Sequence, residues 1–297
     1  MSLTSLSEPA GKRRGYTLGV ITFDYHSHND RCGHAIGTLE DYVQQAIVLG
    51  LTHFGMSDHG PAYWLEGDHA QPGIQMAISE LPNYVAEAIA LKERYADRIA
   101  LAVGIEADFI EGHEEKLAAW LAAHPFDYVL GSVHYALGHS VFNRRHWTAQ
   151  RPERIFRDYY RQVILAAKSG LFDILSHLTV IDTYSPGIPE KLAAELYPQV
   201  AAAIAESGCI VELNTSCYRK QPFWDAPYPN LPMLTELIKC GVPLTFGSDC
   251  HAPSEIHFAR SKVEILLEGL DISLEAQPNR VKRSHIQTFR APPRGGG

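Results

Sequence analysis

The chain has 297 residues, of which 45% are hydrophobic and 20% are charged, so it is long enough to bury a full core as a single α/β domain. Its formal net charge is −8, and the segment that we expect to be densely basic is the C-terminal tail. This argues against a protein whose main task is to bind a nucleic-acid backbone, although a few local basic residues could bind a small anionic substrate. No apolar run approaches the length of a membrane span, so we also expect no membrane partner.

The five cysteines form no Cys-x-x-Cys pair, which predicts free thiols and a cytoplasmic location. The start of the chain has basic residues but no apolar segment behind them, which argues against a secretory signal. We predict three regions: a flexible N-terminal segment at residues 1–15, a single barrel domain at residues 16–276, and a basic Pro/Gly-rich tail at residues 277–297 that ends in disorder.

Apolar runs alternate with amphipathic segments along the chain. The runs predict strands at residues 18–23, 51–56, 99–105, 128–133, 172–176, 209–213 and 242–246. The amphipathic segments predict helices at residues 38–50, 81–96, 113–123, 151–170, 189–208 and 231–241. Thr38 is the expected N-cap of the first helix, and Pro198 should kink or break the fifth. The alternation predicts a parallel sheet covered on both faces, and we favour a barrel because a polar residue follows every strand.

Histidines and carboxylates gather at these strand ends. His26 and His28 are two residues apart, so on a strand they project from one face. The other polar residues at or just after strand ends are His34, His59, Glu106, His134, His177, Asn214, Asp249 and His251. In a parallel barrel these ends converge, and imidazoles with carboxylates suit Zn²⁺, Mn²⁺ or Fe²⁺. The alternative is that histidine is merely common among the polar residues that end barrel strands.

Eight short motifs occur in a fixed order along most of the chain. They are Tyr25-His-Ser-His28, Cys32-Gly-His34, Ser57-Asp-His59, Gly104-Ile-Glu106, Gly131-Ser-Val-His134, Ser176-His177, Glu212-Leu-Asn-Thr-Ser216 and Gly247-Ser-Asp-Cys-His251. Over residues 24–259 this order resembles the PHP (polymerase and histidinol phosphatase) superfamily, and most closely its histidinol-phosphatase branch. The resemblance implies a distorted (β/α)7, TIM-like barrel with a metal cluster at the C-terminal ends of its strands.

The resemblance also implies two to three divalent metal ions, as Zn, Mn or Fe, and assigns ligands to each. The first ion would be held by His26, His28, Glu106 and Asp249. The second would be held by Glu106, His134 and His177, and the third by His34, His59 and His251. Two neighbouring ions would hold a bridging water and supply hydroxide for in-line attack on the phosphorus of a phosphate monoester. The candidate catalytic residues are Asp30, Glu106, Asp249 and His251.

Four residues are candidates for substrate contact. They are Arg219, Lys220, Asn214 and Arg31. Arg219 is the first choice for phosphate because its planar guanidinium matches phosphate oxygens, and a solvated loop charge is the alternative. Asp30 and Arg31 lie between two ligand histidines, so they either act on substrate or form a salt-bridged turn. Asp58 precedes a ligand and is expected to orient it or nearby backbone.

The implied activity is hydrolysis of L-histidinol phosphate in histidine biosynthesis, by a monomer or a homodimer. Thr179 stands where the branch is expected to carry an acidic residue, which keeps a PHP phosphoesterase for a nucleotide or another small phosphate as the alternative. An amidohydrolase would need an eighth strand and usually a bridging lysine. A metal-binding module without catalysis is a further alternative, but every expected ligand position is occupied.

Overall fold

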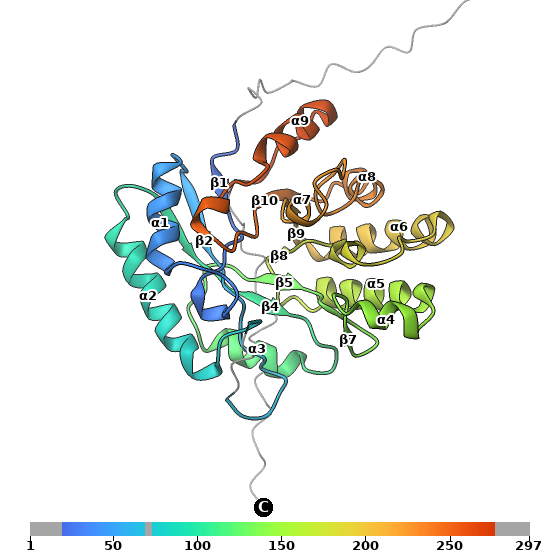
Figure 1. The fold of residues 1–297 in the computed structure, drawn as a ribbon, viewed down its shortest axis with the longest axis horizontal. Coiled ribbons are helices and arrows are strands. Elements are labelled where there is room, and N and C mark those ends of the chain that lie inside the picture. Colours follow the sequence, from blue (N-terminus) through green and yellow to red (C-terminus); the bar gives the residue numbers. More distant parts are fainter. Residues whose placement is uncertain (1–19, 69–72, 277–297) are drawn as a thin grey trace, which may run out of the picture.

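Parallel strands occupy the centre of the fold and helices surround them (Figure 1). The architecture is taken from a computed structural model that describes residues 20–68 and 73–276. The predicted N-terminal segment at residues 1–15 and the predicted tail at residues 277–297 lie outside the described residues. The histidine of the undescribed residues 69–72, His69, lies outside them as well. The expected α/β class with parallel strands is confirmed.

The parallel strands form two sheets. The first has the order β1 (Phe23–Asp24), β2 (His53–Met56), β3 (Ala100–Val103). The second has the order β10 (Leu244–Gly247), β9 (Ile210–Asn214), β8 (Ile174–Leu175), β5 (Leu130–Ser132), β4 (Glu106–Asp108). An antiparallel hairpin joins β6 (Tyr135–Ala136) to β7 (His139–Ser140).

Backbone hydrogen bonds connect the two sheets at both edges. The Tyr25 amide donates to the Phe246 carbonyl at 3.2 Å, which places the end of β1 beside β10. The Glu106 amide donates to the Asp58 carbonyl at 3.1 Å, which places the start of β4 beside the residues that follow β2. The C-terminal ends of strands from both sheets therefore meet on one side of the fold.

The helices lie outside the strands. They are α1 (Leu39–Val48), α2 (Leu81–Arg94), α3 (Glu114–Ala122), α4 (Arg144–Ala149), α5 (Pro152–Lys168), α6 (Glu190–Ser207), α7 (Cys217–Lys220), α8 (Leu231–Lys239) and α9 (Arg260–Leu270). Short 3₁₀ turns are η1 (Asp30–Cys32), η2 (Ile78–Glu80), η3 (Val180–Thr183) and η4 (Pro253–Glu255). In the described part of the chain, every helix is too short or too polar to cross a membrane.

The element predictions are mostly confirmed, with local differences. Thr38 caps α1 in a capping box with Asp41. Of the kink or break predicted at Pro198, the break does not occur, since α6 continues through this residue. The predicted strand at residues 99–105 corresponds to β3, which ends before Gly104, and a further strand, β4, begins at Glu106. A Cβ at Gly104 would lie 2.3 Å from the buried Tyr128 ring. The hairpin and the helices α4, α7 and α9 were not predicted.

Candidate metal centre

Four of the predicted metal-binding side chains meet where β1 and β10 end and β4 begins. His26 and His28 are fully buried, and Glu106 is 2% exposed. The Nε2 atom of His26 lies 3.6 Å from Glu106 Oε2 and 3.7 Å from Asp249 Oδ1. The Nε2 atom of His28 lies 3.0 Å from Asp249 Oδ1 and 3.7 Å from Glu106 Oε2. The structure thus brings together all four residues that sequence reasoning assigned to a first ion.

A second group forms around the other oxygen of Glu106. Its Oε1 atom lies 3.1 Å from His177 Nε2 and 3.8 Å from His134 Nε2. The two imidazole nitrogens themselves are 3.4 Å apart. Because Glu106 faces the first group with one oxygen and this group with the other, it stands between them as predicted for a bridging carboxylate.

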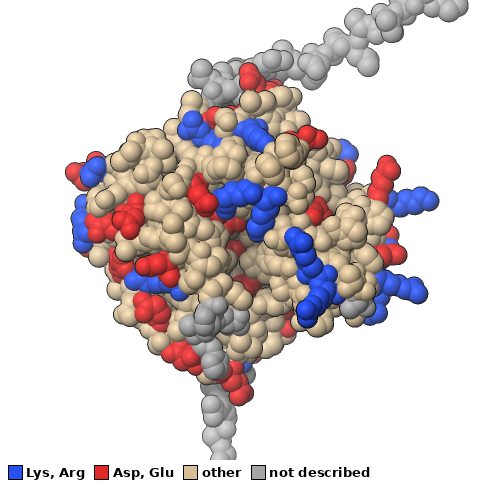
Figure 2. Space-filling model, viewed as in Figure 1, with Lys and Arg blue, Asp and Glu red and all other residues tan. Residues whose placement is uncertain are grey.

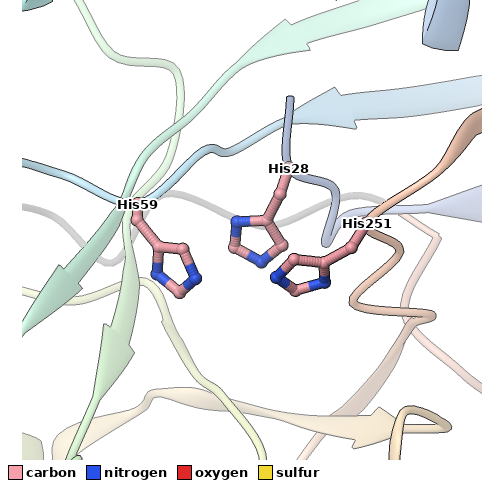
Figure 3. Close-up of side chains that lie close together, drawn as sticks. All are labelled: His28, His59 and His251. Carbon is pink, nitrogen blue, oxygen red and sulfur yellow. The ribbon is translucent and has the colours of Figure 1, made fainter. Parts of the chain in front are cut away.

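A third group is built from His28, His59 and His251, whose rings come from three separate segments and lie side by side (Figure 3). The ring centroids of His28 and His59 are 4.0 Å apart, and those of His28 and His251 are 4.3 Å apart. The predicted ligand His34 is exposed, with its Nε2 atom 2.8 Å from His251 Nε2. His28 was assigned to the first group alone, but it adjoins this one as well.

The donor atoms of these groups fit divalent metal ions. His26 Nε2 is buried and has no hydrogen-bond partner among the described residues, and the buried Glu106 Oε2 lies 2.6 Å from His59 Nδ1. A buried polar atom without a partner is costly unless something else satisfies it. In four triads of this cluster, the nitrogen and oxygen atoms all lie within 4.8 Å of one another. Such mixed imidazole and carboxylate donors suit Zn²⁺, Mn²⁺ or Fe²⁺.

The electrostatics keep some of the ligands in the forms that metals bind. Burial, together with the charge of His59, lowers the pKa of His28 to about 3. Burial and the charge of His28 lower the pKa of His251 to about 2. For Glu106, burial alone would raise the pKa, but the charges of His59 and His26 hold it well below its ordinary value. Neutral imidazoles and ionised carboxylates are the forms that coordinate metals. Against the effect of burial, Glu212 raises the pKa of His26 and Glu106 raises the pKa of His59 to about 9, so metal binding would displace protons from these two rings.

Three carboxylates hold the outer ring nitrogens of ligand histidines. Glu212 Oε1 lies 2.7 Å from His26 Nδ1, and Asp108 Oδ1 lies 2.7 Å from His134 Nδ1. The expected orienting residue Asp58 places its Oδ1 atom 3.3 Å from His28 Nδ1 and also accepts the His59 amide. Such partners fix the tautomer and orientation of a ligand histidine.

Sequence reasoning missed Glu212 and Asp108, although a signal was present. Glu212 is two residues before the candidate Asn214 on β9, and Asp108 is two residues after the candidate Glu106 on β4. Residues two apart on a strand share a face, so both carboxylates had to point toward the cluster.

Two of the substrate candidates are engaged with the backbone and side chains around Asp249. Arg219 donates to the carbonyl oxygens of Asp249 at 2.5 Å and Ser248 at 3.3 Å. The buried side chain of Asn214 donates to Glu212 Oε2 at 2.9 Å and reaches Asp249 Oδ2 at 3.4 Å. Both residues therefore border the cluster and hold its parts in place.

Lys220 has a freer position at the rim. It is exposed, with its Nζ atom 5.2 Å from the centre of the Phe142 ring, and that ring is 5.6 Å from the His134 ring. Figure 2 shows a hollow near the middle of one face, with Lys and Arg side chains gathered beside it. An anion that enters such a hollow is attracted by these charges.

Arg31 matches the alternative of a salt-bridged turn, whereas Asp30 does not take part in its ion pairs. The Arg31 guanidinium contacts Glu80 at 3.0 Å and Glu87 at 2.5 Å, which ties η1 to η2 and α2. Asp30 is exposed, and no side-chain hydrogen bond of it is seen among the described residues.

The loop after His59 packs against the fold. Its Tyr63 side chain is buried and donates its hydroxyl to the Asp108 carbonyl.

The chain was compared with known proteins. The PHP domain family model matches residues 24–216. A probable histidinol-phosphatase of Deinococcus radiodurans is 35% identical over 240 residues, which cover 79% of this chain and 88% of that protein. A histidinol-phosphatase of Bacillus subtilis is 25% identical over 260 residues, which cover 80% of this chain and 96% of that protein.

Among solved structures, the histidinol phosphate phosphatase of Lactococcus lactis, in complex with zinc, L-histidinol and phosphate, matches with a TM-score of 0.67. It is 21% identical, and the match covers 83% of this chain and 94% of that one. At this identity the match supports the fold. The family model and the Deinococcus relative together confirm the resemblance seen in the sequence, and the chain belongs to the PHP domain family.

Proposed function

We propose that the protein is a metal-dependent phosphomonoester hydrolase, and specifically a histidinol-phosphatase that converts L-histidinol phosphate and water to L-histidinol and phosphate in histidine biosynthesis. The observation that carries the proposal is that His26, His28, Glu106 and Asp249 come together in the interior, where His26 Nε2 has no hydrogen-bond partner in the described chain. The name of the Deinococcus relative, at 35% identity, supports the choice of substrate.

The fold and the ligand sets follow as part of this proposal. We infer that the parallel strands close into the distorted (β/α)7 barrel, which the hydrogen bonds at both sheet edges support. The first ion would be held by His26, His28, Glu106 and Asp249, and the second by Glu106, His134 and His177. The third would be held by His34, His59 and His251, with His28 adjoining them.

When bound, such ions lower the pKa of a coordinated water and neutralise charge on phosphoryl oxygens. The protein contributes by holding the metal ligands and the phosphate of the substrate in position. Glu106 and Asp249 keep the ligand histidines of separate segments at fixed positions. Lys220 attracts the phosphate to the rim, and Arg219 retains N–H donors beyond the two hydrogen bonds that it makes to carbonyl oxygens. Asp30, which is exposed and lies between the ligands His28 and His34 in the sequence, is the candidate for protonating the leaving oxygen.

A phosphate-release assay over a panel of esters tests the substrate. The panel contains L-histidinol phosphate, nucleoside monophosphates and sugar phosphates, assayed with Zn²⁺ or Mn²⁺. We expect the highest kcat/KM for L-histidinol phosphate. The Lys220→Ala variant should raise KM for every cleaved ester more than it lowers kcat, because the lysine attracts the phosphate without adjoining the reacting atoms. A strong preference for another ester would overturn the assignment to histidinol phosphate.

One observation favours a second candidate, a phosphoesterase for a nucleotide or another small phosphate. Thr179, where the branch is expected to carry an acid, is buried, and its hydroxyl accepts the Asn230 amide at 3.0 Å. This position therefore offers no carboxylate to the ammonium group of histidinol. The same panel separates the two candidates.

A further inference from the structure

Glu212 is a buried carboxylate that contacts three parts of the cluster at once. It is 1% exposed, and it lies on β9 with its side chain toward the ligand histidines. One oxygen, Oε1, lies 2.7 Å from His26 Nδ1. The other, Oε2, accepts the backbone N–H of His177 at 3.0 Å and the side-chain N–H of Asn214 at 2.9 Å.

The neighbouring strand leaves room for this carboxylate. Gly247 on β10 is paired in register with Asn214, two residues beyond Glu212. A Cβ at Gly247 would lie 1.8 Å from Glu212 Oε1 and 2.7 Å from the Cβ of His26. Only glycine at this position allows Glu212 and His26 to approach each other. The contact therefore depends on Glu212 of β9 and on Gly247 of β10.

The two histidines held by Glu212 belong to different proposed ions. His26 is assigned to the first ion and His177 to the second. His177 has a φ of 22°, in the left-handed region that non-glycine residues rarely adopt, and the Glu212 bond to its amide holds it there. Both oxygens of Glu212 already have partners, so the residue acts on the ions through histidines and is not expected to be a ligand itself.

We propose that Glu212 is a positioning residue that couples the first and second metal sites, because one carboxylate fixes the ring of His26 and the backbone of His177. The proposal rests on the ligand sets of the proposed function. Asp108 provides a contrast within the same centre, since its carboxylate orients His134 and so serves the second site. Asp173 provides a matched control, since this buried carboxylate accepts the Val129 amide at the opposite end of the strands.

Metal binding to the full chain tests the coupling. Wild type, Glu212→Gln, Asp108→Asn and Asp173→Asn are stripped with a chelator and titrated with Zn²⁺ against a chromophoric competitor. Glu212→Gln should weaken binding of both tightly held ions by about 10–100-fold, the usual effect of losing a partner that orients a ligand. Asp108→Asn should weaken one ion, and Asp173→Asn neither. The coupling is refuted if Glu212→Gln binds both ions as wild type does, or loses affinity for one ion only.

Two further measurements separate metal coupling from a general effect on folding. Loading with Co²⁺ should give altered visible bands in Glu212→Gln and unchanged bands in Asp173→Asn, because the bands report ligand geometry. If Glu212→Gln is not recovered folded, Glu212→Asp is titrated instead, since it keeps the charge but withdraws the carboxylate from both histidines. Wild-type affinity for both ions in that variant would overturn the proposal. Failure of the wild type to release phosphate would reject the proposed function and leave these binding results intact.

Discussion

The two ends of the central strands use carboxylates in different ways. At the N-terminal ends, Asp127 and Asp173 each accept a backbone amide of a neighbouring segment, from Val103 and Val129 respectively, both at 2.8 Å. At the opposite side, where the candidate metal centre lies, Glu106 faces imidazoles, and its Oε2 atom lies 2.6 Å from His59 Nδ1. Asp127 and Asp173 thus complete the backbone, whereas Glu106 turns both of its oxygens toward imidazoles of the candidate metal centre.

The largest expected effect comes from changing the carboxylate between the first two groups. Glu106→Gln keeps the shape of the side chain but removes its charge and one acceptor. Loss of a mere orienting partner costs about 10–100-fold, so loss of this central ligand should lower kcat by at least about 100-fold, with metal content reduced. Phosphate release and metal analysis of the purified variant measure both effects.

A histidine at the other end of the strands is the control. His53 begins β2, so His53→Ala changes an imidazole far from the cluster, and its kcat should stay close to that of wild type. The comparison would break down if Glu106→Gln retained near wild-type turnover, or if both variants lost activity to the same extent.

The contribution of a buried aspartate that faces no imidazole to folding stability should change with pH in the opposite direction from that of Glu106. Burial raises the pKa of Asp182 from its ordinary value of 3.8 to about 6, and the Asn230 amide, 2.7 Å away, offsets only part of that rise. The unfolded chain then releases this proton at lower pH than the folded protein. Stability should therefore fall as pH rises from about 4 to above 6, by about 3 kcal/mol at most.

The variant Asp182→Asn isolates this effect. Its free energy of unfolding, measured by urea denaturation between pH 4 and 8, should lack the fall attributed to Asp182. Parallel pH curves for the variant and wild type would show that the carboxylate does not titrate in this window.

A carboxylate that completes the backbone should affect stability without affecting chemistry. Asp173→Asn weakens a charged acceptor for the Val129 amide, and a lost buried hydrogen bond of this kind costs about 1–3 kcal/mol. Urea denaturation measures that loss, while kcat per folded molecule should remain unchanged. A large fall in kcat at unchanged stability would remove the distinction between the two strand ends.

The smallest effect is expected at Arg31, which lies at the catalytic end but faces α2. Its ion pairs with Glu80 and Glu87 are partly exposed, so Arg31→Ala should cost about 1 kcal/mol or less after allowance for solvent screening. KM and kcat should change by less than about threefold. A tenfold or larger rise in KM would instead restore Arg31 as a substrate contact.

Much of the candidate centre was predictable because it depends on strand geometry. His26 and His28, two apart at the end of β1, had to share a face, and parallel strands had to bring Glu106 and Asp249 toward them. The capping box at Thr38 is equally local. These features need only the chain direction and a period of two or of 3.6 residues.

What could not be predicted depends on contacts between distant segments. Arg31 could have faced either the cluster or α2, and only the packing of α2 decides that it meets Glu87. β3 ends before Gly104, which lies beside the Tyr128 ring, a contact that the apolar run itself does not reveal. The role of Glu212 likewise depends on Gly247 of the adjacent strand.

The most direct test of the account is whether phosphate release depends on metal. The full chain is treated with a chelator, desalted, and assayed with L-histidinol phosphate before and after addition of Zn²⁺, Mn²⁺ or Fe²⁺. The account predicts no significant release by the stripped protein and recovery with at least one of these ions. Release that is undiminished after the metal has been removed would contradict it, as would failure of every ion to restore activity to correctly folded protein.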